Sequence, residues 1–305
     1  MVWYLFSFGS AAFSSIAAIL EKKVLFKENA MFYSFVLSLF NVVFSLPFIW
    51  FIDFAKVSGV ALWVLFFKSF LGALSFFYVM KGLKNLQINN SLPLLVATPG
   101  LVAVFAFILL GETLGVFHIL GLVLLLLGSY IINIESHKRL LDPIRVYIKT
   151  KGHHYIGIAL LIFTFTSILD KVLLSKFKLP PTAFLLFQHI FLAFFFAIFV
   201  LVGYLFVKKY KKSVIASSVR LFKSKQSWQL LGLICLTGLV TIAYRYSHIM
   251  AVKLSFSVAL ALAMKRFSVL FAVIFGGRIF KEEFWLRRTL ATLLMIIGAA
   301  FIIML

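Results

Sequence analysis

Ten separate runs of about 20 apolar residues follow one another along this chain of 305 residues. At about 1.5 Å per residue, each run can form a helix that crosses a hydrocarbon core of about 30 Å. Backbone polar groups in a bilayer must be satisfied within the protein, and continuous apolar runs lack the alternation of a barrel strand. We therefore predict an all-α membrane protein with spans 2–20, 31–52, 60–80, 91–110, 116–134, 155–174, 182–207, 229–250, 255–277 and 285–305.

The composition agrees with this fold class. Hydrophobic residues make up 63% and charged residues 13% of the chain, with a mean hydropathy of +1.10, whereas a soluble domain carries about 25% charged residues. The spans leave no room for a soluble domain, so the function is expected inside the bilayer. The first run lacks the basic segment that opens a signal peptide, and we interpret it as a span.

The net charge of +21 is interpreted as basic loops against anionic lipid headgroups rather than as a nucleic-acid surface. In or beside the odd-numbered loops lie 21 Lys and Arg residues, against five near the even-numbered loops. This bias predicts a multi-pass protein, most simply of the plasma membrane, with the odd-numbered loops cytoplasmic and both termini outside. Two connectors, 135–154 and 208–228, carry most of the charge.

The second half of the chain repeats features of the first. "ILEKKVL" (Ile19–Leu25) returns as "ILDKVLL" (Ile168–Leu174) at an offset of 149, and "FAFILLGETLG" (Phe105–Gly115) corresponds to "FGGRIFKEEFW" (Phe275–Trp285) at an offset of 170. Each half holds five spans, and an odd number inverts the second half relative to the first. The predicted organisation is a repeat over 1–134, a basic connector over 135–154 and a second repeat over 155–305, an arrangement typical of secondary transporters.

At these motifs the chain resembles the EamA family of the drug/metabolite transporter superfamily. The "GE-x-L" turn after the fourth span, its partner "KEEF" after the ninth, and the charged pairs closing spans 1 and 6 carry the resemblance, which extends over essentially the whole chain. It implies a ten-helix bundle that moves small metabolites by alternating access. Members are commonly drawn with both termini cytoplasmic, the opposite of the charge bias, so the orientation stays open.

Basic side chains within spans are the first candidates for substrate contact, because a Lys or Arg near the bilayer centre costs about 2.5–3.5 kcal/mol on insertion scales. Arg266 is favoured for binding a carboxylate or phosphate, since a planar guanidinium can form paired hydrogen bonds. The alternative is an internal ion pair or carbonyl contact that only holds the bundle together. The basic candidates are Arg266, Lys265, Arg245 and Lys68.

Uncharged polar residues in the spans are further candidates for the substrate path, although an isolated intramembrane amide or imidazole more often bonds between helices. These are Gln188, His189, Asn41, Tyr78 and Tyr246. Acids lie near span ends, where they either gate the path with a neighbouring Lys or cap the next helix. The gating or helix-end set is Glu21, Lys22, Asp170, Lys171, Glu112 and Glu282.

The sequence thus predicts a secondary transporter of a small polar, anionic or zwitterionic metabolite, since acids that could neutralise the buried cations are scarce. A lipid-phosphate flippase of the polyprenyl-phosphate type is the alternative. No enzymatic activity, cofactor, metal or catalytic residue is expected: the single Cys235 forms no cluster, and no G-x-x-x-x-G-K-[ST] loop is present. The expected partners are the substrate and the bilayer but no nucleic acid, and a homodimer is left open.

Overall fold

The structure is a computed structural model that describes residues 2–85, 98, 101–102, 104–105, 115–133, 151–206, 225–254, 262, 265, 267–279 and 285–303. The described residues are almost entirely helical and include no strand. The α-helices are α1 Trp3–Leu25, α2 Ala30–Ser45, α3 Gly59–Asn85, α6 Val116–Asn133, α8 Lys151–Lys171, α9 Pro181–Phe206, α11 Lys225–Leu254, α13 Phe267–Ile279 and α14 Trp285–Ile303. The described residues also form two 3-10 helices, η1 Leu46–Phe51 and η2 Phe54–Lys56, and one π-helix, η4 Val172–Lys176.

The helices coincide with the predicted spans in most of the chain. Nine of the ten runs contain one of these α-helices, although α13 covers only the later part of the ninth, and the fourth run lies mostly outside the described residues. Five helical stretches are long and apolar enough to cross a membrane: Ala30–Phe51, Gly59–Lys84, Gly152–Lys176, Pro181–Phe206 and Trp228–Leu254. The described part of the chain therefore supports an all-α membrane fold.

Several boundaries differ from the sequence prediction. Helix α1 continues five residues beyond the predicted end at residue 20. In this last part the Lys22 side chain is accommodated by a hydrogen bond from its Nζ to the Leu83 carbonyl at 2.5 Å. Helix α8 begins at Lys151, so that His153 and His154 belong to its first turn and not to the connector. Charged and polar residues end a hydropathy run without ending the helix.

Local sequence sets the other helix ends. The side chain of Asn29 accepts a hydrogen bond from the Met31 backbone N–H at 2.9 Å and caps α2. Helix α9 opens on Pro181, whose missing N–H is not needed in a first turn. Just before it, Lys178 takes a positive φ of 50° as the chain turns out of η4.

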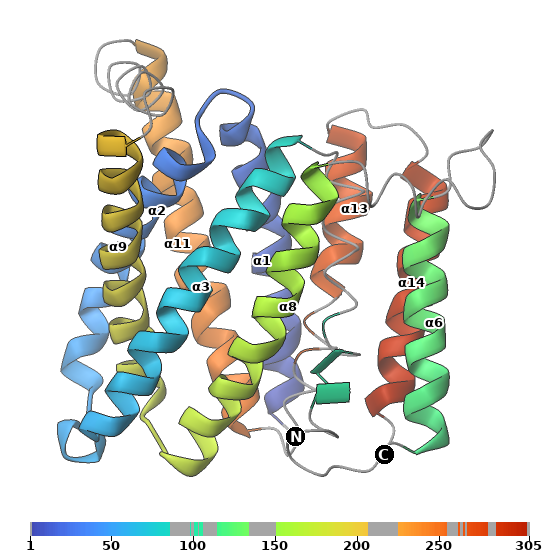
Figure 1. Ribbon diagram of the computed structural model, residues 1–305, viewed down its shortest axis with the longest axis horizontal. Helices are drawn as coiled ribbons and strands as arrows, with labels where there is room; N and C mark the ends of the chain where they lie inside the picture. Colours follow the sequence, from blue (N-terminus) through green and yellow to red (C-terminus); the bar gives the residue numbers. More distant parts are fainter. Residues whose placement is uncertain are drawn as a thin grey trace.

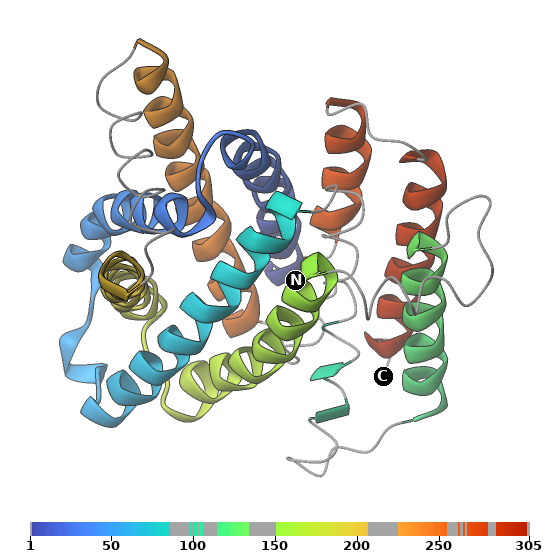
Figure 2. The same cartoon turned by 45° about the horizontal axis from the view of Figure 1, so that its top comes forward.

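The helices lie side by side with alternating directions (Figure 1). In that view α1 and α3 run upward while α8 and α11 run downward. The closest pairs are α1 with α11, α3 with α8, α2 with α9, and α6 with α14. Figure 2 shows the α6–α14 pair at one edge beside α13. Each pair joins a helix of the first half of the chain to one of the second, so the two halves form one bundle.

Small residues let two of these pairs approach closely enough for hydrogen bonds between helices. The Ser10 hydroxyl donates to the Tyr244 carbonyl at 3.0 Å, which joins α1 to α11. The Ser75 hydroxyl donates to the Ala159 carbonyl at 2.9 Å, which joins α3 to α8. Such contacts replace the hydrophobic driving force that is absent between helices in lipid. They fix the two helix pairs that flank the interior of the bundle.

A close contact of this kind generates the first prediction. A Cβ at Gly128 in α6 would lie 2.2 Å from the Met295 Cγ and 2.9 Å from the Ala291 carbonyl oxygen of α14. We expect Gly128→Ala to lower the melting temperature of the detergent-purified protein, because overpacking costs about 1–3 kcal/mol. The control is Gly232→Ala in α11, where nothing lies within 4 Å. It should leave the melting temperature unchanged or raise it, because Ala favours a helix; equal behaviour of the two variants would contradict the prediction.

Candidate functional site

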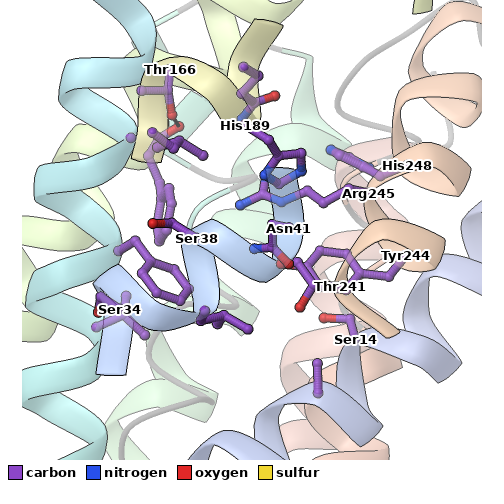
Figure 3. A pocket seen from close by; sticks show the side chains of 18 of the residues that line it. Ser14, Ser34, Ser38, Asn41, Thr166, His189, Thr241, Tyr244, Arg245 and His248 are labelled. Carbon is purple, nitrogen blue, oxygen red and sulfur yellow. Dashed lines mark hydrogen bonds between the residues drawn. The ribbon is translucent and has the colours of Figure 1, made fainter. Parts of the chain in front are cut away.

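A cavity of about 190 Å³ lies among helices of both halves of the chain. Its wall comes from α1, α2, α3, α8, α9, α11 and α13 together with Leu262 and Lys265. Figure 3 shows part of this wall, with polar side chains from α2, α9 and α11 pointing toward one another. The polar residues that line it are Ser14, Glu21, Ser34, Ser38, Asn41, Lys68, Thr166, Ser167, Asp170, Gln188, His189, Thr241, Tyr244, Arg245, His248, Lys265 and Ser268.

Lys68 and Asp170 form a buried ion pair in this wall. The Lys68 Nζ lies 2.7 Å from the Asp170 Oδ1, and the two side chains are 4% and 19% exposed. The Nζ also lies 4.7 Å from the ring centroid of Phe184, within cation–π range. Lys68 is therefore neutralised inside the bundle. The pair links α3 of the first half to α8 of the second, immediately before the π-helical turn η4.

Two further cations gather around Tyr244. The Arg245 guanidinium carbon lies 5.4 Å, and the Lys265 Nζ 5.3 Å, from the centroid of the Tyr244 ring. Glu21 also lines the cavity and is only 7% exposed. No acid within salt-bridge distance of Arg245 lies in the described part of the chain. This region therefore presents positive charge to the cavity with one carboxyl group in its wall.

Neutral polar atoms in the wall fall into two groups. The hydroxyls of Ser34, Ser38 and Thr166 donate to carbonyls of their own helices at 2.8, 2.6 and 3.1 Å. In contrast, the Asn41 Oδ1 and both ring nitrogens of His189 have no hydrogen-bond partner among the described residues. The hydroxyls are thus satisfied locally, while the amide oxygen and the imidazole are left for other contacts.

Six of the nine residues predicted to bind substrate line this cavity: Lys68, Arg245, Lys265, Asn41, Gln188 and His189. Two others lie elsewhere in the described structure. Tyr78 stacks on Tyr155 with ring centroids 5.8 Å apart, and Tyr246 packs on Phe48 at 5.2 Å. The ninth, Arg266, lies outside the described residues, so its role stays a prediction.

Of the predicted gating residues, some line the cavity, some make other contacts and some lie outside the described residues. Glu21 and Asp170 line the cavity, whereas the sequence places them at span ends. Lys22 instead donates to the Leu83 carbonyl, and Lys171 ends α8 with its carbonyl accepting from the Ser175 hydroxyl at 2.5 Å. Glu112 and Glu282 lie outside the described residues. Their roles in gating remain predictions.

Sequence reasoning missed most of the hydroxyl-bearing wall and His248. Helical spacing carries a usable signal for these residues: Ser34 and Ser38 lie seven and three residues before Asn41, and Thr241 and His248 lie four before and three after Arg245. Residues so spaced share one face of a helix. The face that holds one buried amide or cation therefore identifies its polar neighbours.

The model of the EamA-like transporter family matches the chain over residues 1–134. The match confirms the resemblance to the drug/metabolite transporter superfamily at the same residues as the predicted first repeat. Together with the apolar helices, it indicates an integral multi-pass membrane protein of the transporter type.

A solved crystal structure is similar in fold, with a TM-score of 0.64 and 14% sequence identity. The alignment covers 98% of this chain and 95% of the other. At this identity the likeness concerns the fold alone. No curated protein sequence matches the chain.

The ion pair generates the second prediction. Lys68→Met should lower stability by about 3–5 kcal/mol, because it leaves Asp170 as a buried charge without its partner. The double variant Lys68→Met, Asp170→Leu should be more stable than the single one, since no charge is left behind. Thermal unfolding of the detergent-purified protein measures both.

The control pair is Lys56 and Asp53 at η2, also 2.7 Å apart but with side chains 70% and 48% exposed. Lys56→Met should not change the melting temperature measurably, because exposed pairs contribute little. A double variant at Lys68 and Asp170 that is less stable than Lys68→Met alone would show that burial of the charge does not explain the effect.

Proposed function

We propose that the protein is a secondary transporter that moves a small polar metabolite with an anionic group by alternating access. The observation that carries this proposal is the cavity between the two halves of the chain, with Lys68, Arg245 and Lys265 in its wall. Isolated charge in a membrane interior is costly and marks substrate or ion pathways. A purely structural bundle has no need of such a wall.

The proposed architecture is ten spans in two inverted repeats. In support, the cavity-lining residues of α1 and α8 correspond one to one at the offset of 149 that the sequence motifs give. Ser14, Ala17, Ala18 and Glu21 line the cavity from α1, and Phe163, Thr166, Ser167 and Asp170 line it from α8. These two helices run in opposite directions (Figure 1). Inverted repeats of this kind place substrate sites where the halves meet.

The hydrogen bonds between helices follow the same relation. Ser10 and Ala159 are equivalent at the offset of 149; one bonds to the eighth predicted span through Tyr244, the other to the third through Ser75. Glu21 and Asp170 each lie 11 residues further along, about 16 Å in a helix. This spacing supports the proposal that the two acids are related by the inverted repeat.

The charge of the wall supports an anionic or zwitterionic substrate. Among the described lining residues are three cations and two acids, and Asp170 already neutralises Lys68. Arg245 and Lys265 are the other two cations among the described lining residues. Arg266, next to Lys265 in the chain, is proposed as a further cation of this site.

The third prediction tests this function. A thermal-stability screen of the purified protein against amino acids, sugar phosphates, nucleotide sugars and lipid-phosphate analogues should find an anionic solute that raises the melting temperature. Arg245→Gln should weaken its binding about 10–100-fold, since a hydrogen bond to a charged group contributes about 1.5–3 kcal/mol. Uptake of the same solute into proteoliposomes should fall in parallel.

Two controls sharpen the result. Arg245→Lys retains the charge and should recover part of the binding, and Lys176→Gln removes an exposed charge outside the cavity and should bind normally. Stabilisation by lipid phosphates alone would favour the flippase alternative. Stabilisation by neutral or cationic solutes alone would mean that the buried cations hold the bundle together.

A further inference from the structure

Three uncharged polar side chains from three helices meet in one part of the cavity. Asn41 of α2, His189 of α9 and Thr241 of α11 are 7%, 1% and 4% exposed. Figure 3 shows them around the Arg245 side chain, with the His189 ring beside the guanidinium and Asn41 beside Thr241. The Asn41 Oδ1 also lies close to Gly238, one turn before Thr241. The two side chains therefore share the α2–α11 interface.

Their polar atoms are left without protein partners. The Asn41 Oδ1, both ring nitrogens of His189 and the Thr241 Oγ1 have none among the described residues. Buried polar atoms in native proteins are nearly always hydrogen-bonded, so each exception needs an explanation. The hydroxyls of Ser34 and Ser38 in the same wall do not share the feature, since they donate to their own helices. The unpartnered atoms are thus concentrated beside Arg245.

The chemistry of these atoms limits what they can bind. An amide oxygen only accepts hydrogen bonds, so the Asn41 Oδ1 requires a donor, which a carboxylate or phosphate dianion cannot provide. A threonine hydroxyl and a neutral imidazole each donate and accept. A cationic donor would meet the positive charge of Arg245, which faces the same cavity. An uncharged group that both donates and accepts satisfies all three side chains.

We propose that Asn41, His189 and Thr241 form a subsite for a hydroxyl group of the substrate. The proposal rests on the proposed function, in which the neighbouring Arg245 binds the anionic group. It narrows the substrate class to small hydroxylated anions, with the hydroxyl close to the carboxylate or phosphate. A site built to hydrogen-bond a hydroxyl rejects the analogue that lacks it, because its own polar groups are then buried without partners.

Matched pairs of anions test the subsite. We would measure binding of lactate against propionate, and of glycerol 3-phosphate against propyl phosphate, to the purified full-length chain by calorimetry. The hydroxylated member should bind at least tenfold more tightly. Thr241→Val, nearly isosteric, and His189→Phe should each reduce that ratio at least threefold.

Thr237→Val is the matched control, one turn earlier in α11, because the Thr237 hydroxyl donates to the Leu233 carbonyl at 2.6 Å and lies outside the cavity wall. It should keep the full ratio. Equal binding of both members of each pair would overturn the subsite while anion binding stands, and so would a ratio that Thr241→Val and His189→Phe leave intact. Failure of every anion to bind would overturn the anionic substrate together with the subsite.

Discussion

The ion pair between Lys68 and Asp170 is the interaction on which the interior of this bundle depends. A lysine in the middle of an apolar helix needs a nearby anion, and Asp170 provides it at 2.7 Å from the opposite half of the chain. Both charges are required in place for either to be tolerated. Because this pair neutralises itself, the positive character of the cavity comes from Arg245 and Lys265. The structural cation and the candidate substrate contacts are thereby distinguished.

The same reasoning separates the uncharged polar residues. A serine or threonine can satisfy its hydroxyl within its own helix, as Ser34 and Thr166 do, so its presence in a span carries little energetic cost. The polar atoms of asparagine and histidine side chains are not satisfied within their own helix in this way. Asn41, His189 and the unpartnered Thr241 hydroxyl therefore indicate more about function than the hydroxyls that bond within their own helices, because a ligand is the simplest partner for their polar atoms.

This difference in the free energy of burial also explains which features could be predicted from the sequence. Hydropathy located most of the helices, and the residues most expensive to bury, such as Lys68, Arg245 and His189, line one cavity in the described structure. Their roles in binding stay predictions. The Ser and Thr residues of the cavity wall were not predicted, because a hydroxyl that bonds to a carbonyl of its own helix can be buried at little cost in free energy at any helix position. Glu21 was assigned to a span end because a hydropathy run stops at the first charge, whereas α1 continues to Leu25. Tyr78 finds an aromatic partner in Tyr155, which no periodicity reveals.

Glu21 and Asp170, which are related in the proposed repeats, have different surroundings. The two acids correspond in the sequence at the offset of 149, yet of the two only Asp170 has a lysine within salt-bridge distance in the described structure. The two proposed repeats therefore differ in charge at this position. In the proposed transporter, the likeness of the halves allows two related conformations, and the unlike charges make their energies differ. A substrate that binds Arg245 acts on that difference directly, because Arg245 belongs to the second half of the chain alone.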